Sequence, residues 1–110
     1  MYEENTLKVL QNKEFLNISY ANILYVKAER NYVSIVTYGK QQHLIRHKIT
    51  ELQQLLPEQH FTRVHRSYVV NVNHVKKITA SYIIIDELKI PIGRSYRLVV
   101  DRIIASISNN

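Results

Sequence analysis

Two arginine–serine pairs stand where apolar, strand-like segments end. The first pair, Arg66-Ser67, interrupts the alternating segment 61–71. The second pair, Arg94-Ser95, directly follows the apolar run Ile-Pro-Ile-Gly. Guanidinium groups at strand ends suit contact with an anion, because their planar forks match the geometry of phosphates and base edges. The two pairs therefore predict loops that bind a polyanion.

The composition is basic and contains no cysteine. The chain has 110 residues, with 15 Lys and Arg against 9 Asp and Glu, a net charge of +6 and a pI of about 9.7. This length predicts one domain over 1–110 with room for one core. A basic balance fits a nucleic-acid partner, but charge alone fits a merely solvated surface equally well. The lack of cysteine excludes disulfides, thiolate metal ligands and cysteine nucleophiles.

Neither a membrane segment nor an export signal is predicted. No apolar run approaches the ~20 residues that a membrane-spanning helix needs. The first five residues are acidic and polar, unlike the positive start of a signal peptide. We therefore expect a cytoplasmic protein without a membrane partner.

The histidines form no recognisable catalytic or metal-binding motif. His43 and His47 are four residues apart, but they straddle the end of a predicted strand and the start of a predicted helix. No H-E-x-x-H motif accompanies them, and no glycine-rich phosphate loop or G-x-S-x-G motif is present. We therefore expect no enzyme activity, no bound metal and no cofactor.

The elements that must position the arginines are mainly β-strands. Alternating, β-branched and aromatic segments separated by turn residues predict strands on both sides of Arg66 and at 6–11, 15–19, 23–28, 32–38, 41–46, 75–79, 82–85 and 88–92. Apolar residues at spacings of three and four predict a short helix over about 48–56, which Pro57 ends. The same spacing predicts a C-terminal helix over about 96–107.

Three ordered segments, together with this pattern, resemble the LytTR-type DNA-binding domain. They are Ile-Leu-Tyr-Val-Lys-Ala-Glu-Arg-Asn-Tyr-Val at 23–33, Phe-Thr-Arg-Val-His-Arg-Ser-Tyr-Val-Val-Asn at 61–71 and Ile-Pro-Ile-Gly-Arg-Ser-Tyr-Arg at 90–97. The resemblance covers about 6–107. It implies stacked antiparallel β-sheets with short helices, and loops that enter the major groove of double-stranded DNA. It also implies a transcriptional regulator, the output domain of a two-component response regulator, although no receiver domain is present in this chain. Direct-repeat target sites and paired copies on DNA are further implications.

The resemblance also implies roles for individual side chains. It assigns base reading to Asn31, Tyr32, Arg66 and Arg94. We expect phosphate contacts, which fix the position of the protein without selecting a sequence, from Arg30, Lys48, Arg63, His65, Ser67, Ser95 and Arg97.

Each assignment has a structural alternative. The guanidinium of Arg66 or Arg94 can pair with a surface carboxylate instead of a base. Asn31 can simply adopt a turn conformation, and Tyr32 can fill the surface of a sheet. Ser67 and Ser95 can cap local turns, and His65 can brace its loop through hydrogen bonds to the backbone.

Two other functions compete with duplex DNA binding. An RNA or single-strand binding module needs exposed aromatic rings among positive charges, and Tyr32 and Tyr38 alternate on one predicted strand near Lys27 and Arg30. A protein-interaction β domain would use exposed strand edges, and its basic surface would be incidental.

Overall fold

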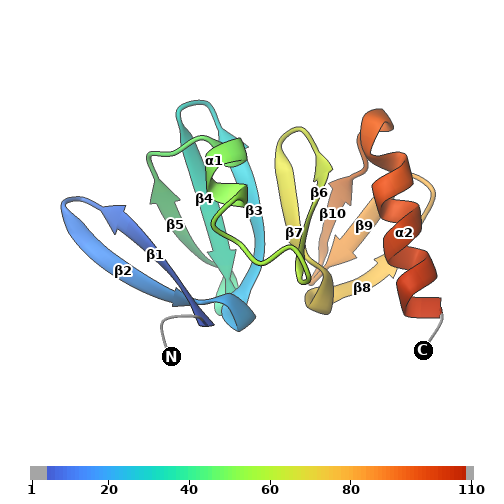
Figure 1. The fold of residues 1–110 in the computed structure, drawn as a ribbon, viewed down its shortest axis with the longest axis horizontal. Helices are drawn as coiled ribbons and strands as arrows, with labels where there is room; N and C mark the ends of the chain where they lie inside the picture. Colours follow the sequence, from blue (N-terminus) through green and yellow to red (C-terminus); the bar gives the residue numbers. More distant parts are fainter. Residues whose placement is uncertain (1–4, 109–110) are drawn as a thin grey trace.

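The computed structural model describes residues 5–108, which form three antiparallel sheets (Figure 1). The central sheet has the order β5-β4-β3-β7-β6, made of β5 (Gln41–Ile45), β4 (Tyr32–Thr37), β3 (Ile23–Glu29), β7 (Tyr68–Asn71) and β6 (Phe61–His65). A hairpin of β1 (Thr6–Gln11) and β2 (Glu14–Ser19) lies beside one end of it. A third sheet lies towards the other end, made of β8 (Val75–Ile78), β9 (Tyr82–Ile85) and β10 (Leu88–Pro91). The predicted mainly β class is confirmed, and each strand range outside 61–71 is correct to within one residue.

Helical segments are short, apart from the last. They are α1 (Ile49–Gln53), α2 (Arg97–Ser108) and the 3₁₀ turns η2 (Tyr20–Asn22), η3 (Tyr38–Lys40), η4 (Val72–His74) and η5 (Arg94–Tyr96). The predicted C-terminal helix is confirmed with a shift of one residue, because η5 occupies the segment just before it. The side chain of Ile107, which completes the apolar spacing of that helix, lies outside the described residues.

The predicted helix over 48–56 is too long at both ends. Lys48 has extended backbone angles and precedes α1 as its cap. After Gln53 the chain turns more tightly, because the amides of Leu55 and Leu56 donate to carbonyls three residues earlier. Leu56 is nevertheless buried, so its apolar spacing reflects packing after the helix and not a further helical turn.

The central sheet separates two hydrophobic clusters. In β7, Val69 belongs to the cluster beneath α1 and the β1–β2 hairpin, while its neighbour Val70 belongs to the cluster beneath the third sheet and α2. β3 divides in the same way, with Val26 on one side and Leu24 on the other. Both faces of the central strands are therefore buried, which explains their nearly continuous apolar sequence.

A β-bulge in β6 explains the irregular alternation around the first arginine–serine pair. Arg63 pairs with Val69 and His65 pairs with Tyr68, which leaves Val64 as the extra residue. Phe61 and Val64 are both buried, but Phe61 lies in the cluster beneath α1 and Val64 in the cluster beneath the third sheet. The bulge directly precedes the two-residue turn between β6 and β7.

Candidate nucleic-acid interface

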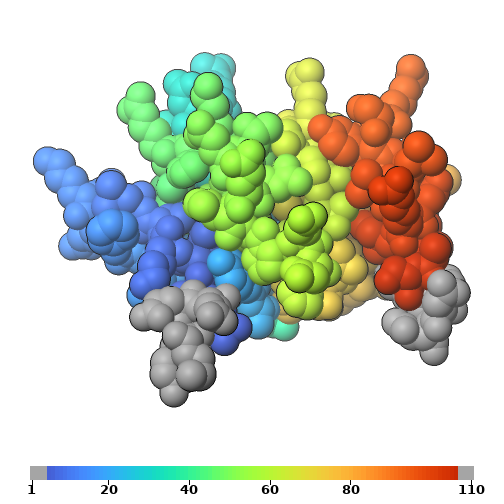
Figure 2. All heavy atoms as spheres, in the orientation of Figure 1, coloured from blue at the N-terminus to red at the C-terminus, as the bar shows by residue number. Residues whose placement is uncertain are grey.

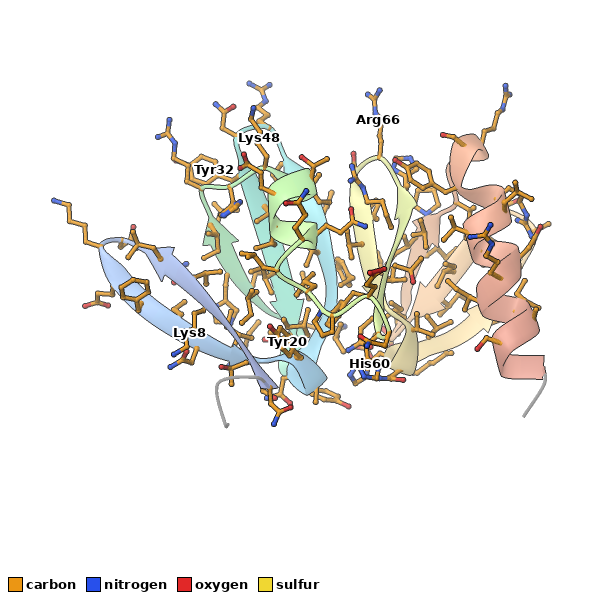
Figure 3. The ribbon with its side chains drawn as sticks, viewed as in Figure 1. Lys8, Tyr20, Tyr32, Lys48, His60 and Arg66 are labelled. Atoms are coloured by element: carbon orange, nitrogen blue, oxygen red, sulfur yellow. The ribbon has the colours of Figure 1, made fainter. Side chains whose placement is uncertain are left out.

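Three loops with predicted contact residues lie along one edge of the molecule. They are the β3–β4 turn, the β6–β7 turn and the segment that leads through η5 into α2 (Figures 1 and 3). The amide of Ala28 donates to the carbonyl of Ser67 at 2.8 Å, which fixes the first loop beside the second. The amide of Gly93 donates to the carbonyl of Val64 at 2.8 Å, which fixes the third loop beside the second. Residues more than sixty positions apart in the sequence therefore form one continuous edge.

Arg66 occupies the tip of the β6–β7 turn. Its side chain is exposed and extends away from the sheet, as Figure 3 shows. Behind it, the Nδ1 atom of His65 accepts a 3.0 Å hydrogen bond from the amide of Ser67. The imidazole also packs edge-on against Tyr68, with ring centroids 5.7 Å apart. The turn is thus held by its own side chains while Arg66 remains free to reach a ligand.

Arg63 lies beneath the same turn and is partly buried. Its Nε donates to the carbonyl of His65 at 3.0 Å, and its Nη2 donates to the carbonyl of Arg66. Its Nη1 donates to Oε1 of Gln53 in α1 at 3.2 Å. The guanidinium therefore connects the turn to the helix.

The β3–β4 turn consists of Arg30 and Asn31, between the paired residues Glu29 and Tyr32. Both turn residues are exposed, and Tyr32 is 39% exposed. Arg30 has φ 57°, a left-handed conformation that costs an ordinary side chain free energy. The turn therefore presents its cation and its amide to solvent at the cost of local strain.

Residue 93 is tightly packed within the third loop. A Cβ atom there would lie 2.9 Å from Cδ2 of Tyr96, so the Tyr96 ring would have to shift to accept a side chain. The same Cβ atom would lie 3.4 Å from Cα of His65, an ordinary contact distance, so the third loop packs closely against the β6–β7 turn. Arg94 and Ser95, which follow in η5, are both exposed.

Two other predicted phosphate-contacting residues differ in their surroundings. Lys48 is exposed and lies on the same edge as Tyr32 and Arg66 (Figure 3). Arg97 is half-buried, and its guanidinium donates to the carbonyl of Ala80 and to Oδ1 of Asp101, the latter at 3.2 Å. The structure thus brings Lys48 to the exposed edge, while Arg97 joins α2 to the loop before β9.

The space-filling view shows the edge as a row of projections. Side chains rise from the β3–β4 turn, from the region before α1, from the β6–β7 turn and from the start of the C-terminal segment (Figure 2). The exposed predicted residues on these loops are Arg30, Asn31, Tyr32, Lys48, Arg66, Arg94 and Ser95. Among predicted residues, Arg63, His65 and Arg97 instead use their side chains in internal hydrogen bonds.

Three residues outside the predicted DNA contacts, Gln53, Lys27 and Tyr25, support the side chains near the edge. Gln53 holds Arg63, and the ammonium of Lys27 lies 5.9 Å from the centroid of the Tyr68 ring. Tyr25 packs next to Tyr68, and burial raises the pKa of its phenol, with smaller contributions from Tyr68 and Glu29. No local pattern marks these contacts, because each joins segments that are distant in the sequence.

The described part of the chain contains no group of three or more His, Asp or Glu arranged to hold a metal ion. None of the helices between residues 5 and 108 is long and apolar enough to cross a membrane.

Comparison with known proteins identifies the family. The family model of the LytTr DNA-binding domain matches residues 13–104. The chain belongs to the LytTr DNA-binding domain family. The fold agrees with this membership: the LytTr domain of a Bacillus cereus protein described as a methyl-accepting/DNA response regulator superposes with a TM-score of 0.77. That match covers 91% of this chain and 96% of the other, at 21% identity.

Relatives that carry a LytTr-like region are longer regulators. An uncharacterised response regulatory protein of Vibrio cholerae is 35% identical over 97 residues, which are 81% of this chain and 37% of that protein. The sensory transduction protein LytT of Bacillus subtilis is 32% identical over 81 residues, 68% of this chain and 33% of LytT. The transcriptional regulatory protein YpdB of Escherichia coli is 28% identical over 76 residues, 69% of this chain and 31% of YpdB. The chain thus spans about a third of the length of these relatives.

Proposed function

We propose that this LytTr domain binds double-stranded DNA in a sequence-specific manner and acts as a transcriptional regulator in the bacterial cytoplasm. One observation carries the proposal: three loops with exposed cationic and polar side chains are fixed to one edge by backbone hydrogen bonds at Ala28 and Gly93. Such an edge can neutralise phosphates and present side chains to bases at the same time. The family and the net charge of +6 support the same partner.

The dimensions of the molecule suit contacts along one face of a duplex. The principal extents are 41 × 33 × 25 Å, and the loops are spread along the longest axis (Figure 1). One helical turn of B-DNA is about 34 Å long. Loops at separate points of this edge can therefore enter successive major grooves.

Within this proposal the side chains divide by chemistry. Arg66 and Arg94 donate to guanine, because a guanidinium can bond O6 and N7 together. Asn31 pairs with adenine, and Tyr32 contacts bases beside it. The phosphate-contacting group comprises Arg30, Lys48, His65, Ser67, Ser95 and Arg97.

The wider assembly is also a proposal. The match covers only about a third of the length of relatives that include a response regulatory protein, which supports a receiver domain elsewhere in a parent protein. We further propose that the target DNA contains direct-repeat sites and that two copies of the domain occupy them. Stoichiometry on duplexes with one or two sites, measured by light scattering, tests this pairing.

Binding of RNA or single strands is less well supported by the positions of the aromatic rings. Tyr32 begins β4, whereas Tyr38 follows its end, so the two rings lie at opposite ends of a six-residue strand. That separation is about 20 Å, too far for stacking of neighbouring bases. The Tyr38 hydroxyl also contacts Nδ1 of His74 at 3.4 Å.

Protein interaction remains a second candidate because of one exposed apolar pair. Leu10 and Phe15 face each other across the β1–β2 hairpin and are 55% and 79% exposed. The hairpin lies at one end of the molecule (Figure 1). A contact there is compatible with DNA at the loop edge.

The deciding experiment is selection of bound duplexes from a randomised pool, followed by fluorescence anisotropy of the selected duplex over a salt series. We expect one recurring motif, bound at least about a thousandfold more tightly than a scrambled duplex. Weak binding without enrichment would contradict the proposal. A preference for the single strand over the duplex would support the RNA or single-strand alternative instead.

A further inference from the structure

The Arg63 guanidinium donates hydrogen bonds both to the β6–β7 turn and to α1. Three of its five N–H donors are engaged, by the carbonyl of His65, the carbonyl of Arg66 and Oε1 of Gln53. The two carbonyls belong to the turn, and the amide oxygen belongs to α1. Arg63 therefore links two elements through one rigid, planar group.

The two carbonyls flank the residue that carries the proposed base-reading side chain. The His65 carbonyl belongs to the peptide before Arg66, and the Arg66 carbonyl belongs to the peptide after it. Holding both oxygens fixes the orientation of the backbone on either side of Arg66. Because base discrimination depends on a bidentate geometry, a small rotation of this backbone would misplace the Arg66 fork.

We infer that Arg63, supported by Gln53, is a positioning residue for base recognition by Arg66. The inference rests on the proposed function, and it replaces the phosphate contact expected for Arg63 from sequence. Arg63 is partly buried, whereas Lys48 and Arg66 are exposed at the edge. The neighbouring hydrogen bond from the Ser67 amide to His65 Nδ1 depends on the same turn conformation.

The Arg63→Lys variant distinguishes a positioning role of Arg63 from a direct phosphate contact. Lysine keeps the positive charge and binds phosphate as a point charge, but it cannot hold three acceptors in the fork geometry. We expect discrimination between the selected duplex and its Arg66-contacted base variant to fall about tenfold, while the slope of log affinity against log salt stays the same. Unchanged discrimination in Arg63→Lys would overturn the inference. Arg102→Lys, at an exposed arginine of α2, is the matched control and should change neither quantity.

Arg63→Gln and Gln53→Leu provide the converse tests. A phosphate contact predicts that Arg63→Gln lowers the salt slope by about one with discrimination intact. A positioning role predicts lost discrimination in Arg63→Gln, and a smaller loss in Gln53→Leu, which removes the acceptor in α1. Thermal unfolding of each variant shows whether the domain remains folded. If the Arg63→Lys variant is unfolded, the Gln53→Leu variant becomes the test. Full discrimination between the selected duplex and its base variant by Gln53→Leu would then overturn the inference.

Hydrogen exchange of the Ser67 amide tests, without DNA, whether the three hydrogen bonds of Arg63 (the Arg63 brace) stabilise the turn. In the Arg63→Lys variant we expect this amide to exchange about tenfold faster, because the turn opens more often. If exchange rises but the wild-type domain shows no sequence preference, the brace exists and the proposed function has failed. If exchange is unchanged, the brace itself is refuted, whatever the domain binds.

Discussion

The amide of Gly93 donates a 2.8 Å hydrogen bond to the carbonyl of Val64, the extra residue of the β6 bulge. The bulge interrupts pairing with β7 at this residue, so its carbonyl is available to a third segment. The relative position of the loops that carry Arg66 and Arg94 is therefore set by backbone atoms. Most side-chain substitutions on these loops should change contacts with a ligand without moving the loops.

Arg66→Ala should flatten the preference among duplex sequences. The variant loses a bidentate contact with guanine, which corresponds to about 1–3 kcal/mol of discrimination at one base pair. Competition anisotropy between the selected duplex and its single-base variants measures this loss. Lys8→Ala is the control, because Figure 3 places Lys8 away from the loop edge. Retained discrimination in Arg66→Ala would exclude base reading by this side chain.

Lys48→Ala should weaken binding to every duplex by the same factor. The exposed ammonium neutralises a phosphate, so its removal should reduce the salt slope by about one. Titrations at several salt concentrations, on selected and scrambled duplexes, give this slope. An effect confined to the selected sequence would show that Lys48 reads a base.

Arg30→Gly should make the domain more stable while it weakens DNA binding. Glycine adopts the φ of 57° without strain, so the free energy of unfolding should rise by about 0.5–1 kcal/mol in urea titrations. Arg30→Ala is the matched variant, since it removes the charge but keeps the strain. Both variants should lower the salt slope, and only the glycine variant should gain stability. Equal stability of the two would show that the turn is unstrained.

Asn71→Ala should destabilise the fold by about 2–4 kcal/mol. This side chain is 1% exposed, and its Nδ2 donates to the carbonyls of Ile23 and Tyr20 at 2.9 and 3.3 Å. Its Oδ1 accepts from the amide of Asn73 at 3.0 Å. Urea unfolding measures the loss, with Asn17→Ala on the exposed face of β2 as control. A loss below about 1 kcal/mol would mean that water replaces these bonds.

Tyr25 should make stability fall at alkaline pH. Burial raises the pKa of its phenol in the folded state above the ordinary value of 10.0. As the pH rises past that value, the unfolded chain releases the proton first, so the folded state loses its advantage through the folded pKa. The free energy of unfolding of Tyr25→Phe should therefore decline less above about pH 10 than that of the wild type. If the free energies of unfolding of the two proteins declined in parallel, Tyr25 would be excluded as a source of the alkaline loss of stability.

Strand positions could be predicted from sequence because alternation and turn residues are local signals. Asn12 and Lys13 form a two-residue turn with φ of 53° and 69°, within the turn expected between the first two strands. The helix predicted over 48–56 is too long because Leu55 and Leu56 keep a helical spacing within a tighter turn, in which only Leu56 is buried.

The candidate site was predictable only in part. Exposure of Arg66 and Arg94 follows from their positions at strand ends. The internal bonds of Arg63 depend on the β6 bulge and on Gln53, ten residues earlier in another element. The bonds of Arg97 likewise depend on Ala80, which is distant in the sequence. These contacts are set by tertiary packing, so spacing could not reveal them; only the bond from Arg97 to Asp101, four residues later in a predicted helix, is indicated by the sequence.

The division of β3 and β7 between two hydrophobic clusters has a consequence for synthesis of the protein. Val26 pairs with Val69, so the central sheet cannot close before β7 has left the ribosome. The second cluster also needs Ile83, Ile90 and Val100, which are made later still. Neither hydrophobic cluster can therefore be completed before β7 has left the ribosome, and the second cluster must also wait for α2.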